Sequence, residues 1–189
     1  MLFRSPRRRT EYLVRRAIRL ASPGSIVVDL CCGSGALGAA MAAAIPGIRL
    51  YAADIEKAAV ACARRNLRGI AEVFQGDLFD ALPTELRGRV ELLIVNAPYV
   101  PTVEISGMPP EAREYEPLIT LDGGRDGLDV HRRVAAGAAE WLAHSGTLLI
   151  ETSTGQAAMA VAIFERSGLQ PSVARSKKLD ATVILGTKR

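Results

Sequence analysis

A glycine-rich turn is the first stretch of this sequence that could do chemistry. Apolar residues 26–28 lead into Asp29, and glycines follow at positions 33, 35 and 38. This pattern predicts a strand, a tight turn and a helix, in which the glycines let the backbone approach a ligand closely and the helix start presents free N–H groups. The same glycine spacing is typical of dinucleotide sites. Asp29, however, would repel a pyrophosphate and suits a cation, such as the amino group of an amino-acid-like ligand.

Polar residues also close three later apolar segments, and together with Asp29 they mark one edge of a sheet. Asp54, Asp77 and Asn96 each follow a predicted strand. In open α/β sheets, ligands lie outside the carboxyl ends of the strands. Asp54 is placed to accept both hydroxyls of a ribose, Asp77 to accept from an adenine amine, and the Leu78 N–H to donate to the ring. Each acid alone could instead cap a helix or close a turn. The series predicts a nucleoside site, and the acid before the glycines favours S-adenosylmethionine (SAM) over NAD.

A second chemical motif, Asn96-Ala97-Pro98-Tyr99, follows a continuous apolar strand. The Asn96 side-chain carbonyl and the Ala97 backbone carbonyl can accept both hydrogens of a planar amine or amide, which leaves the nitrogen lone pair directed at a methyl donor. Pro98 restricts Ala97 to an extended conformation, and Tyr99 can stack on the planar group. The tetrapeptide is also common in ordinary turns. Beside the glycine turn and the acids, it predicts a clamp for an –NH2 substrate.

The elements that must position these residues alternate between strand and helix, which predicts the α/β class with a mostly parallel sheet. Strands are expected at residues 25–30, 49–53, 71–75, 90–95, 147–151, 170–175 and 181–186, and helices at 10–21, 36–45, 56–67, 128–143 and 156–167. Residues 100–127 form a long irregular stretch, and loops of that length are usually functional or disordered. Neither a linker nor an internal repeat divides residues 1–189, so one domain is expected.

Length and composition exclude several classes of protein. The chain has 189 residues, 49% of them hydrophobic, which fits a globular domain rather than a disordered chain. It shows neither an apolar run long enough for a membrane span nor a recognisable signal peptide. Cys31, Cys32 and Cys62 lack disulfide-framework and zinc-ligand spacing, so we expect no metal and a reducing, cytoplasmic setting. The net charge is +4, and the arginines among residues 4–9 could contact nucleic acid or an acidic protein, although such a cluster is more often simply solvated.

Taken together, these motifs resemble the release-factor-type protein N5-glutamine methyltransferases, a family of class I SAM enzymes. The resemblance covers nearly the whole chain: Pro6-Arg7-x-x-Thr10-Glu11, the SAM turn at residues 29–35, the amide motif at residues 96–101, and Glu116-Pro117 followed by Leu121-Asp122-Gly123-Gly124-x-Asp126-Gly127-Leu128. The last segment is the most specific, because methyltransferases that act on nucleic-acid bases generally lack it.

The resemblance implies a Rossmann-like, seven-stranded sheet, mostly parallel with an antiparallel last strand and helices on both faces, and SAM as the cofactor. The implied cofactor-binding residues are Asp29, Cys31, Gly33, Gly35, Asp54, Ile55, Asp77, Leu78 and Asn96. Those implied at the methyl acceptor are Asn96, Ala97, Pro98 and Tyr99. The implied reaction is an SN2 transfer from sulfonium to nitrogen that leaves S-adenosylhomocysteine. Orientation and the polar contacts of Asn96 and Ala97 would contribute most of the catalysis.

The sequence departs from the family pattern in two ways. The usual tetrapeptide is Asn-Pro-Pro-Tyr, and Ala97 replaces its first proline, which keeps the backbone acceptor but loses rigidity. The family usually carries a helical N-terminal docking domain, whereas this sequence begins close to the methyltransferase core, so we expect poor action on an intact release factor. A general base is not evident: His131 and His144 are expected at the surface, and Glu151 either lines the groove or belongs to a turn.

The preferred interpretation is a SAM-dependent N-methyltransferase that acts on a glutamine side-chain amide in a protein or peptide. A small-molecule N-methyltransferase is one alternative. A nucleic-acid methyltransferase acting on adenine N6 or cytosine N4 is another, because these bases also present a planar –NH2 group. The arginine cluster favours it, and residues 121–128 oppose it. A nucleotide-binding module or dehydrogenase without methyl transfer is disfavoured by Asp29 and Asn96. No membrane partner is expected.

Overall fold

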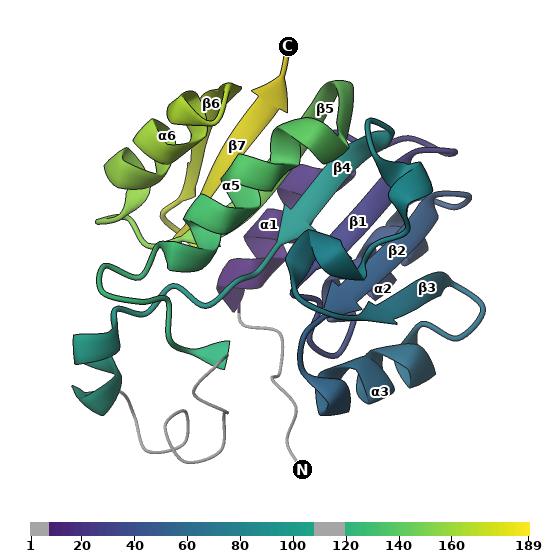
Figure 1. The fold of residues 1–189 in the computed structure, drawn as a ribbon, viewed down its shortest axis with the longest axis horizontal. Helices are drawn as coiled ribbons and strands as arrows, with labels where there is room; N and C mark the ends of the chain where they lie inside the picture. The colour runs from purple at the N-terminus through teal and green to yellow at the C-terminus, as the bar shows by residue number, and fades with distance from the viewer. Residues whose placement is uncertain (1–7, 108–119) are drawn as a thin grey trace.

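Within the residues that the structure, a computed structural model, describes (8–107 and 120–189), seven strands form one sheet (Figure 1). Its order is β3-β2-β1-β4-β5-β7-β6. The strands are β1 (Ile26–Leu30), β2 (Arg49–Asp54), β3 (Ala71–Gln75), β4 (Val90–Val95), β5 (Leu142–Thr152), β6 (Leu169–Ser176) and β7 (Ala181–Lys188). The first five pair in parallel, and β7 pairs antiparallel with both β5 and β6. This is the Rossmann-like sheet that the resemblance implied, antiparallel last strand included.

The strand order reverses beside β1. From β1 the chain builds outward through β2 to β3, and it then crosses to the other side of β1 with β4 and β5. The loops that leave β1 and β4 therefore diverge at their carboxyl ends, and open α/β sheets bind ligands at such a reversal. The glycine turn follows β1 and the Asn96 motif follows β4, so the topology brings both chemical motifs to this point.

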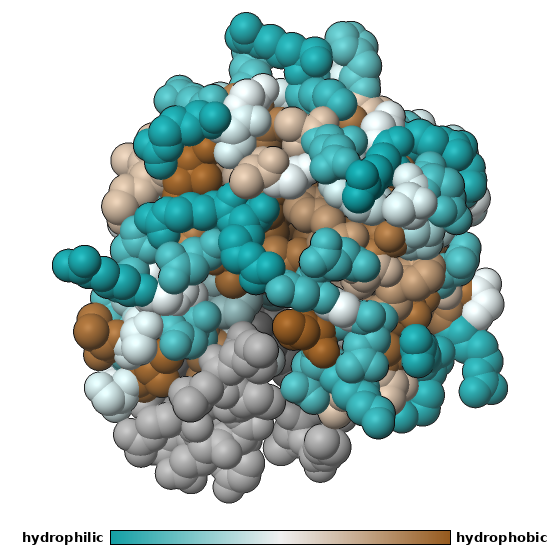
Figure 2. Space-filling model, in the orientation of Figure 1, coloured by the Kyte–Doolittle hydropathy of each residue, from teal (hydrophilic) through white to brown (hydrophobic). Residues whose placement is uncertain are grey.

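Helices cover both faces of the sheet (Figure 1). One apolar layer joins it to α1 (Arg8–Ile18), α2 (Ala36–Ala44) and α3 (Lys57–Asn66). A second layer joins the opposite face to α5 (Asp129–Trp141) and α6 (Ala157–Arg166). Polar residues cover most of the outer surface on this second side, and apolar residues show between them (Figure 2). Because side chains alternate along a strand, Val27 enters the first layer and Val28 the second, which directs Asp29 toward α2.

The observed elements agree with the predicted ones, apart from small shifts at their ends and one larger shift in β5. β3 and β4 have the predicted bounds. β5 begins at Leu142 rather than at residue 147, because α5 leads directly into it and Leu142 pairs with Val90 before the register shifts. Three short 3-10 helices, η1 (Leu78–Ala81), η2 (Thr84–Leu86) and η3 (Thr102–Gly107), lie in the connections of the described chain.

Some predictions lie outside the described residues. They concern the arginines at positions 4 and 7, the Pro6-Arg7 part of the first motif, and Glu116-Pro117. Among the residues that are described, none of the helices has the length and apolar character of a membrane span. The same part of the chain holds no cluster of His, Cys, Asp or Glu side chains that could bind a metal ion.

Candidate active site

The three glycines of the turn after β1 serve different purposes. Gly33 adopts a left-handed φ of 56°, and a Cβ built on it would meet no atom within 4 Å. Gly35 also has a positive φ, of 78°, but its Cβ would lie 2.7 Å from Leu67 Cδ1 of the segment after α3. A Cβ on Gly38 would lie 3.0 Å from Leu50 Cδ2. Gly35 and Gly38 therefore allow close packing, whereas Gly33 leaves open space beside the backbone, as a ligand site requires.

Asp29 is fully buried beneath this turn. Its Oδ2 accepts a hydrogen bond of 2.9 Å from the Gly38 N–H in the first turn of α2, so the helix-capping alternative is present in the structure. Its Oδ1 has no partner among the described residues, and burial raises the pKa of the carboxyl group to about 7. A buried acceptor without a donor is costly. The free oxygen therefore fits a donor that the protein itself does not supply, such as a ligand ammonium group.

Asp54 joins the glycine turn to the start of α3. Its Oδ2 accepts from the Gly33 N–H at 2.8 Å, and its Oδ1 accepts from the Glu56 N–H at 2.9 Å. Each carboxylate oxygen keeps a further lone pair, which a ribose hydroxyl could use. The next residue, Ile55, is 47% exposed, an apolar side chain held at the surface beside the proposed nucleoside position.

The three acids surround Cys31, which has a left-handed φ of 59°. Burial, and then the charges of Asp54, Asp29 and Asp77, raise the pKa of the Cys31 thiol well above its usual range. The parallel register pairs Leu30 with Ala53 and Asp54 with Gln75, so the ends of β1, β2 and β3 lie side by side as predicted. Asp77 differs from the other two, because it forms an ion pair of 2.8 Å with Arg133 of α5 and is partly exposed. Its neighbour Leu78 has a φ of 48°, which turns the chain sharply there.

The Asn96 motif after β4 is bonded to elements that are distant in sequence. Asn96 Nδ2 donates to Thr10 Oγ1 of α1 at 3.4 Å. The Tyr99 hydroxyl donates to Glu151 Oε1 of β5 at 3.0 Å. Thr10 Oγ1 donates to the other oxygen of the same carboxylate, Oε2, also at 3.0 Å. Glu151 is buried within β5, so neither a groove wall nor a turn describes its place; it connects α1 to the motif.

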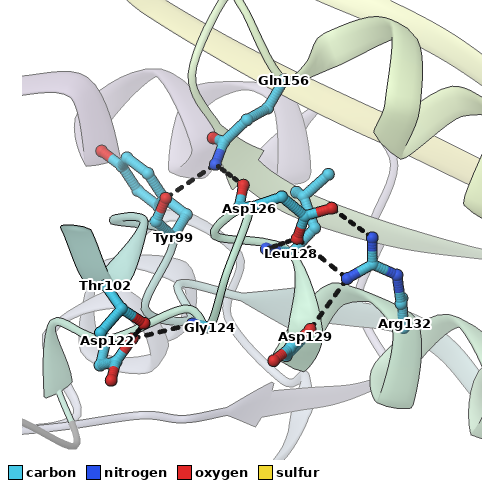
Figure 3. A network of polar contacts seen from close by, with 9 residues as sticks. All are labelled: Tyr99, Thr102, Asp122, Gly124, Asp126, Leu128, Asp129, Arg132 and Gln156. Carbon is cyan, nitrogen blue, oxygen red and sulfur yellow. Dashed lines mark hydrogen bonds and ion pairs between the residues drawn. The ribbon is translucent and has the colours of Figure 1, made fainter. Parts of the chain in front are cut away.

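Gln156 fastens the motif to two further segments (Figure 3). Its Nε2 donates to the carbonyl oxygens of Tyr99, at 2.8 Å, and Asp126, at 2.9 Å. Its Oε1 accepts from the hydroxyls of Thr152, at 3.2 Å, and Ser153, at 2.7 Å. The side chain is buried, and all its polar atoms are used. One carboxamide thus ties the loop after β4, the loop before α5 and the turn after β5 together.

The family-specific segment at residues 121–128 is a tightly packed loop against the same motif. A Cβ on Gly127, whose φ is 77°, would lie 2.3 Å from both Gln156 Nε2 and the Tyr99 carbonyl oxygen. Asp122 accepts from the Thr102 hydroxyl at 2.7 Å. Asp126 pairs with Arg132 of α5, and the hydrogen bond from Arg132 lowers the pKa of Asp126 to about 2 (Figure 3). The glycines and acids of this segment therefore build the loop that holds the Asn96 motif from one side.

The surface position predicted for His131 is wrong. His131 is fully buried in α5, and its Nε2 lies 3.0 Å from the Glu151 carbonyl oxygen. Burial lowers the pKa of the ring to about 4, so the imidazole is neutral near pH 7. A neutral ring that meets a carbonyl oxygen must carry its hydrogen on Nε2. His144, by contrast, is exposed as expected.

Sequence reasoning did not identify two residues that fix the site. Thr10 entered only as a letter of the N-terminal motif, and Gln156 only as a helix start. The signal that could have found them is helical spacing: Thr10 lies in register with Leu13 and Ala17, and Gln156 with Ala160 and Ile163, on the apolar stripe of each helix. Thr10 and Gln156 are both buried in the structure, and buried polar groups require partners.

Comparison with known proteins places this arrangement among methyltransferases. Residues 10–107 match the methyltransferase small domain family. A release factor glutamine methyltransferase of Geobacter sulfurreducens is 37% identical over 166 residues, which cover 86% of this chain and 57% of the relative. A 4-amino-L-phenylalanine/4-methylamino-L-phenylalanine methyltransferase of Streptomyces pristinaespiralis is 37% identical over 171 residues, which cover 86% of this chain and 58% of the relative. The chain thus spans less than two thirds of the length of these relatives.

A solved structure agrees with these sequence matches. The release-factor-specific protein-(glutamine-N5) methyltransferase of Alicyclobacillus acidocaldarius superposes with a TM-score of 0.59 at 25% identity. The superposition covers 97% of this chain and 94% of the other. The resemblance that the motifs indicated is therefore confirmed at the level of sequence and of fold.

Proposed function

Because the chain belongs to the methyltransferase small domain family and has release factor glutamine methyltransferases among its relatives, we propose that it is a SAM-dependent N-methyltransferase acting on the side-chain amide of glutamine in a protein or peptide. One observation carries this proposal. Asp77, Asp54, Asp29 and Asn96 lie at or beside the carboxyl ends of β3, β2, β1 and β4, which are consecutive in the sheet. In this proposal, a nucleoside-binding half and an amide-binding half would thus meet where the strand order reverses.

The residues of the first half fit SAM. When bound, SAM supplies a methyl group activated by a positively charged sulfur. The partnerless Asp29 oxygen would accept from its ammonium group, and the free lone pairs of Asp54 from its ribose hydroxyls. Ile55 and the Leu78 N–H would contact the adenine. Asp77 would accept from the adenine amine only by sharing or exchanging its bond with Arg133.

The residues of the second half fit an –NH2 group. Asn96 Oδ1 and the Ala97 carbonyl oxygen would accept its two hydrogens, which fixes the plane of the group and leaves the lone pair of the nitrogen free. Pro98 keeps Ala97 extended, and the Tyr99 ring lies beside them with its hydroxyl held by Glu151. As positive charge develops on the nitrogen, both contacts strengthen, which is the preorganised stabilisation that lowers a barrier.

An aromatic amine is a second candidate acceptor. The relative from Streptomyces pristinaespiralis is named for 4-amino-L-phenylalanine and its methylated form. An arylamine also presents a planar –NH2 group, so the same two acceptors would hold it. The nucleic-acid alternative rests on the same chemistry at adenine or cytosine, without support from these relatives.

The test is a direct comparison of acceptors. The purified chain is incubated with methyl-labelled SAM and, separately, a short glutamine peptide with blocked ends, 4-aminophenylalanine, or adenine- and cytosine-containing oligonucleotides. We expect label on the glutamine side chain, located by tandem mass spectrometry, and a rate about 100- to 1000-fold lower with Asn96→Ala. Transfer to the arylamine alone would show that the methyl acceptor is an aromatic amine rather than a glutamine amide. Transfer to a base alone would contradict the proposal.

A further inference from the structure

A polar cluster made of Arg9, Thr10, Tyr99 and Glu151 lies behind Asn96 and is not explained by substrate binding. Glu151 is only 1% exposed and Thr10 only 2% exposed. The two oxygens of Glu151 accept separately from Thr10 and from Tyr99, both at 3.0 Å. Arg9, whose charge acts on Tyr99, forms an ion pair with Asp180. A carboxylate buried to this extent is costly unless its partners are well placed, so these bonds constrain the residues that make them.

The cluster allows only one direction for each of its hydrogen bonds. An ionised carboxylate accepts and cannot donate. Thr10 has a single hydroxyl hydrogen, and Glu151 takes it. The Thr10 oxygen can therefore only accept from its other neighbour, Asn96, which lies 3.4 Å away through Nδ2. Asn96 must turn its NH2 group toward Thr10, and its carbonyl oxygen is left to face the opposite way.

We propose that Glu151 and Thr10 are positioning residues that fix the orientation of the Asn96 carboxamide, so that its oxygen faces the methyl acceptor. This inference rests on the proposed function. The –NH2 group of a methyl acceptor donates hydrogen bonds and so needs an oxygen opposite it. If Asn96 were flipped, its own NH2 group would face that of the substrate, donor against donor. Glu151 holds the Tyr99 ring through its other oxygen, so one buried carboxylate orients both polar side chains of the motif.

The alternative is that the cluster only stabilises the fold by attaching α1 to β5. If so, loss of the cluster would lower stability, and SAM binding and methyl transfer would fall together. Removal of any other buried threonine hydroxyl would then have a similar effect. Thr147 provides the matched control, because it is buried in the middle of β5 and its hydroxyl shares a hydrogen bond of 3.2 Å with Thr187, which does not belong to the cluster.

The experiment compares Thr10→Val, Thr10→Ser, Glu151→Gln and Thr147→Val in the full chain. Thr10→Val keeps the shape of the side chain and removes the hydroxyl, and Glu151→Gln introduces a donor that can reverse the direction of the chain of bonds. We expect both to lower kcat for the glutamine peptide about 10- to 100-fold, less than removal of a direct contact costs. The Kd for SAM should be unchanged, Thr10→Ser should recover most of the loss, and Thr147→Val should retain wild-type kcat.

A second measurement does not depend on activity. In the wild type, NMR should show contacts between the Asn96 side-chain NH2 protons and the Thr10 methyl group, and Glu151→Gln should weaken them. Burial, assisted by the charge of Glu151 and its hydrogen bond, raises the pKa of Tyr99. The same variant should therefore lower it, as followed by a titration of labelled tyrosine.

The outcomes separate the two proposals. Wild-type protein that methylates no amide or amine would overturn the proposed function, whatever the NMR contacts show. An active wild type whose kcat survives both Thr10→Val and Glu151→Gln would overturn the inference alone. So would a loss of kcat in Thr147→Val as large as that in Thr10→Val, since the effect would then be one of general stability.

Discussion

Asp29 and Asp54 are carboxylates at neighbouring strand ends, yet their surroundings differ. Asp54 is partly exposed, and each of its oxygens accepts from a backbone N–H. Asp29 is fully buried and keeps one oxygen without a partner among the described residues. We therefore expect mutation of Asp54 to change the affinity for SAM, and we expect the contribution of Asp29 to that affinity to depend on pH as well.

Asp54→Ala should weaken SAM binding by about 1–3 kcal/mol, the usual cost of removing a charged hydrogen-bond acceptor. Part of this loss would come from the Gly33 turn, whose N–H loses its partner at 2.8 Å. Isothermal titration calorimetry measures the change. Asp80→Ala is the control, because Asp80 is an exposed acid in η1 that the proposal does not use. Equal affinities in the two variants would remove Asp54 from the cofactor site.

The affinity for SAM should rise with pH up to about 7. The pKa of Asp29 is raised to about 7 by burial, so below that pH the free protein holds this carboxyl group protonated. A bound ammonium requires the carboxylate, and binding must then release a proton. The sign is opposite for folding: the contribution of Asp29 to stability is fully present below its unfolded pKa of 3.8 and is lost as pH rises through about 7.

Calorimetry in two buffers with different ionisation enthalpies measures the released proton directly. At pH 6 we expect close to one proton per SAM bound by the wild type, and close to none by Asp29→Asn. A wild type that binds SAM at pH 6 without releasing a proton would show that the ammonium does not meet Asp29.

Gln156 shows how one side chain organises several elements. Gln156→Leu would leave the carbonyl oxygens of Tyr99 and Asp126 without this donor inside the protein. The free energy of unfolding should fall by about 1–3 kcal/mol, as measured by urea denaturation. Gln170→Leu makes the same change at an exposed position of β6 and should cost far less. A similar loss of unfolding free energy in the two variants would mean that the hydrogen bonds of Gln156 to these loops contribute nothing measurable to stability.

The elements were predictable because their signals are local, whereas the ties between them are not. The ends of β1, β2 and β4 are marked by polar residues after apolar runs, and the structure has them there. The bond between Gln156 and Tyr99 joins residues 57 positions apart, which no local pattern encodes. For His131 the signal was present: it precedes Val134 and Ala135 at helical spacing, on the buried side of α5, and was overlooked because its side chain is polar.

At the scale of the whole molecule, the two proposed halves of the site lie on different sides of the reversal in strand order. Asn96→Ala should therefore leave the Kd for SAM almost unchanged while lowering kcat by about 100- to 1000-fold, the effect of losing one preorganised polar contact. Single-turnover methyl transfer with saturating SAM measures the second value, and titration calorimetry the first. A large loss of SAM affinity would instead place Asn96 in the cofactor half.

The pairing of Val100 with Asp122 has a consequence for how this protein can change. Val100, which follows the Asn96 motif, pairs with Asp122 in an isolated parallel bridge outside the sheet, and the Thr102 N–H bonds to the Gly124 carbonyl oxygen at 3.0 Å. A segment whose two ends are fastened together can be lengthened at little cost, about 0.6 kcal/mol for each doubling of a flexible loop. Residues inserted between these two ends would therefore leave the Val100–Asp122 pairing in place, next to the motif that we propose binds the methyl acceptor.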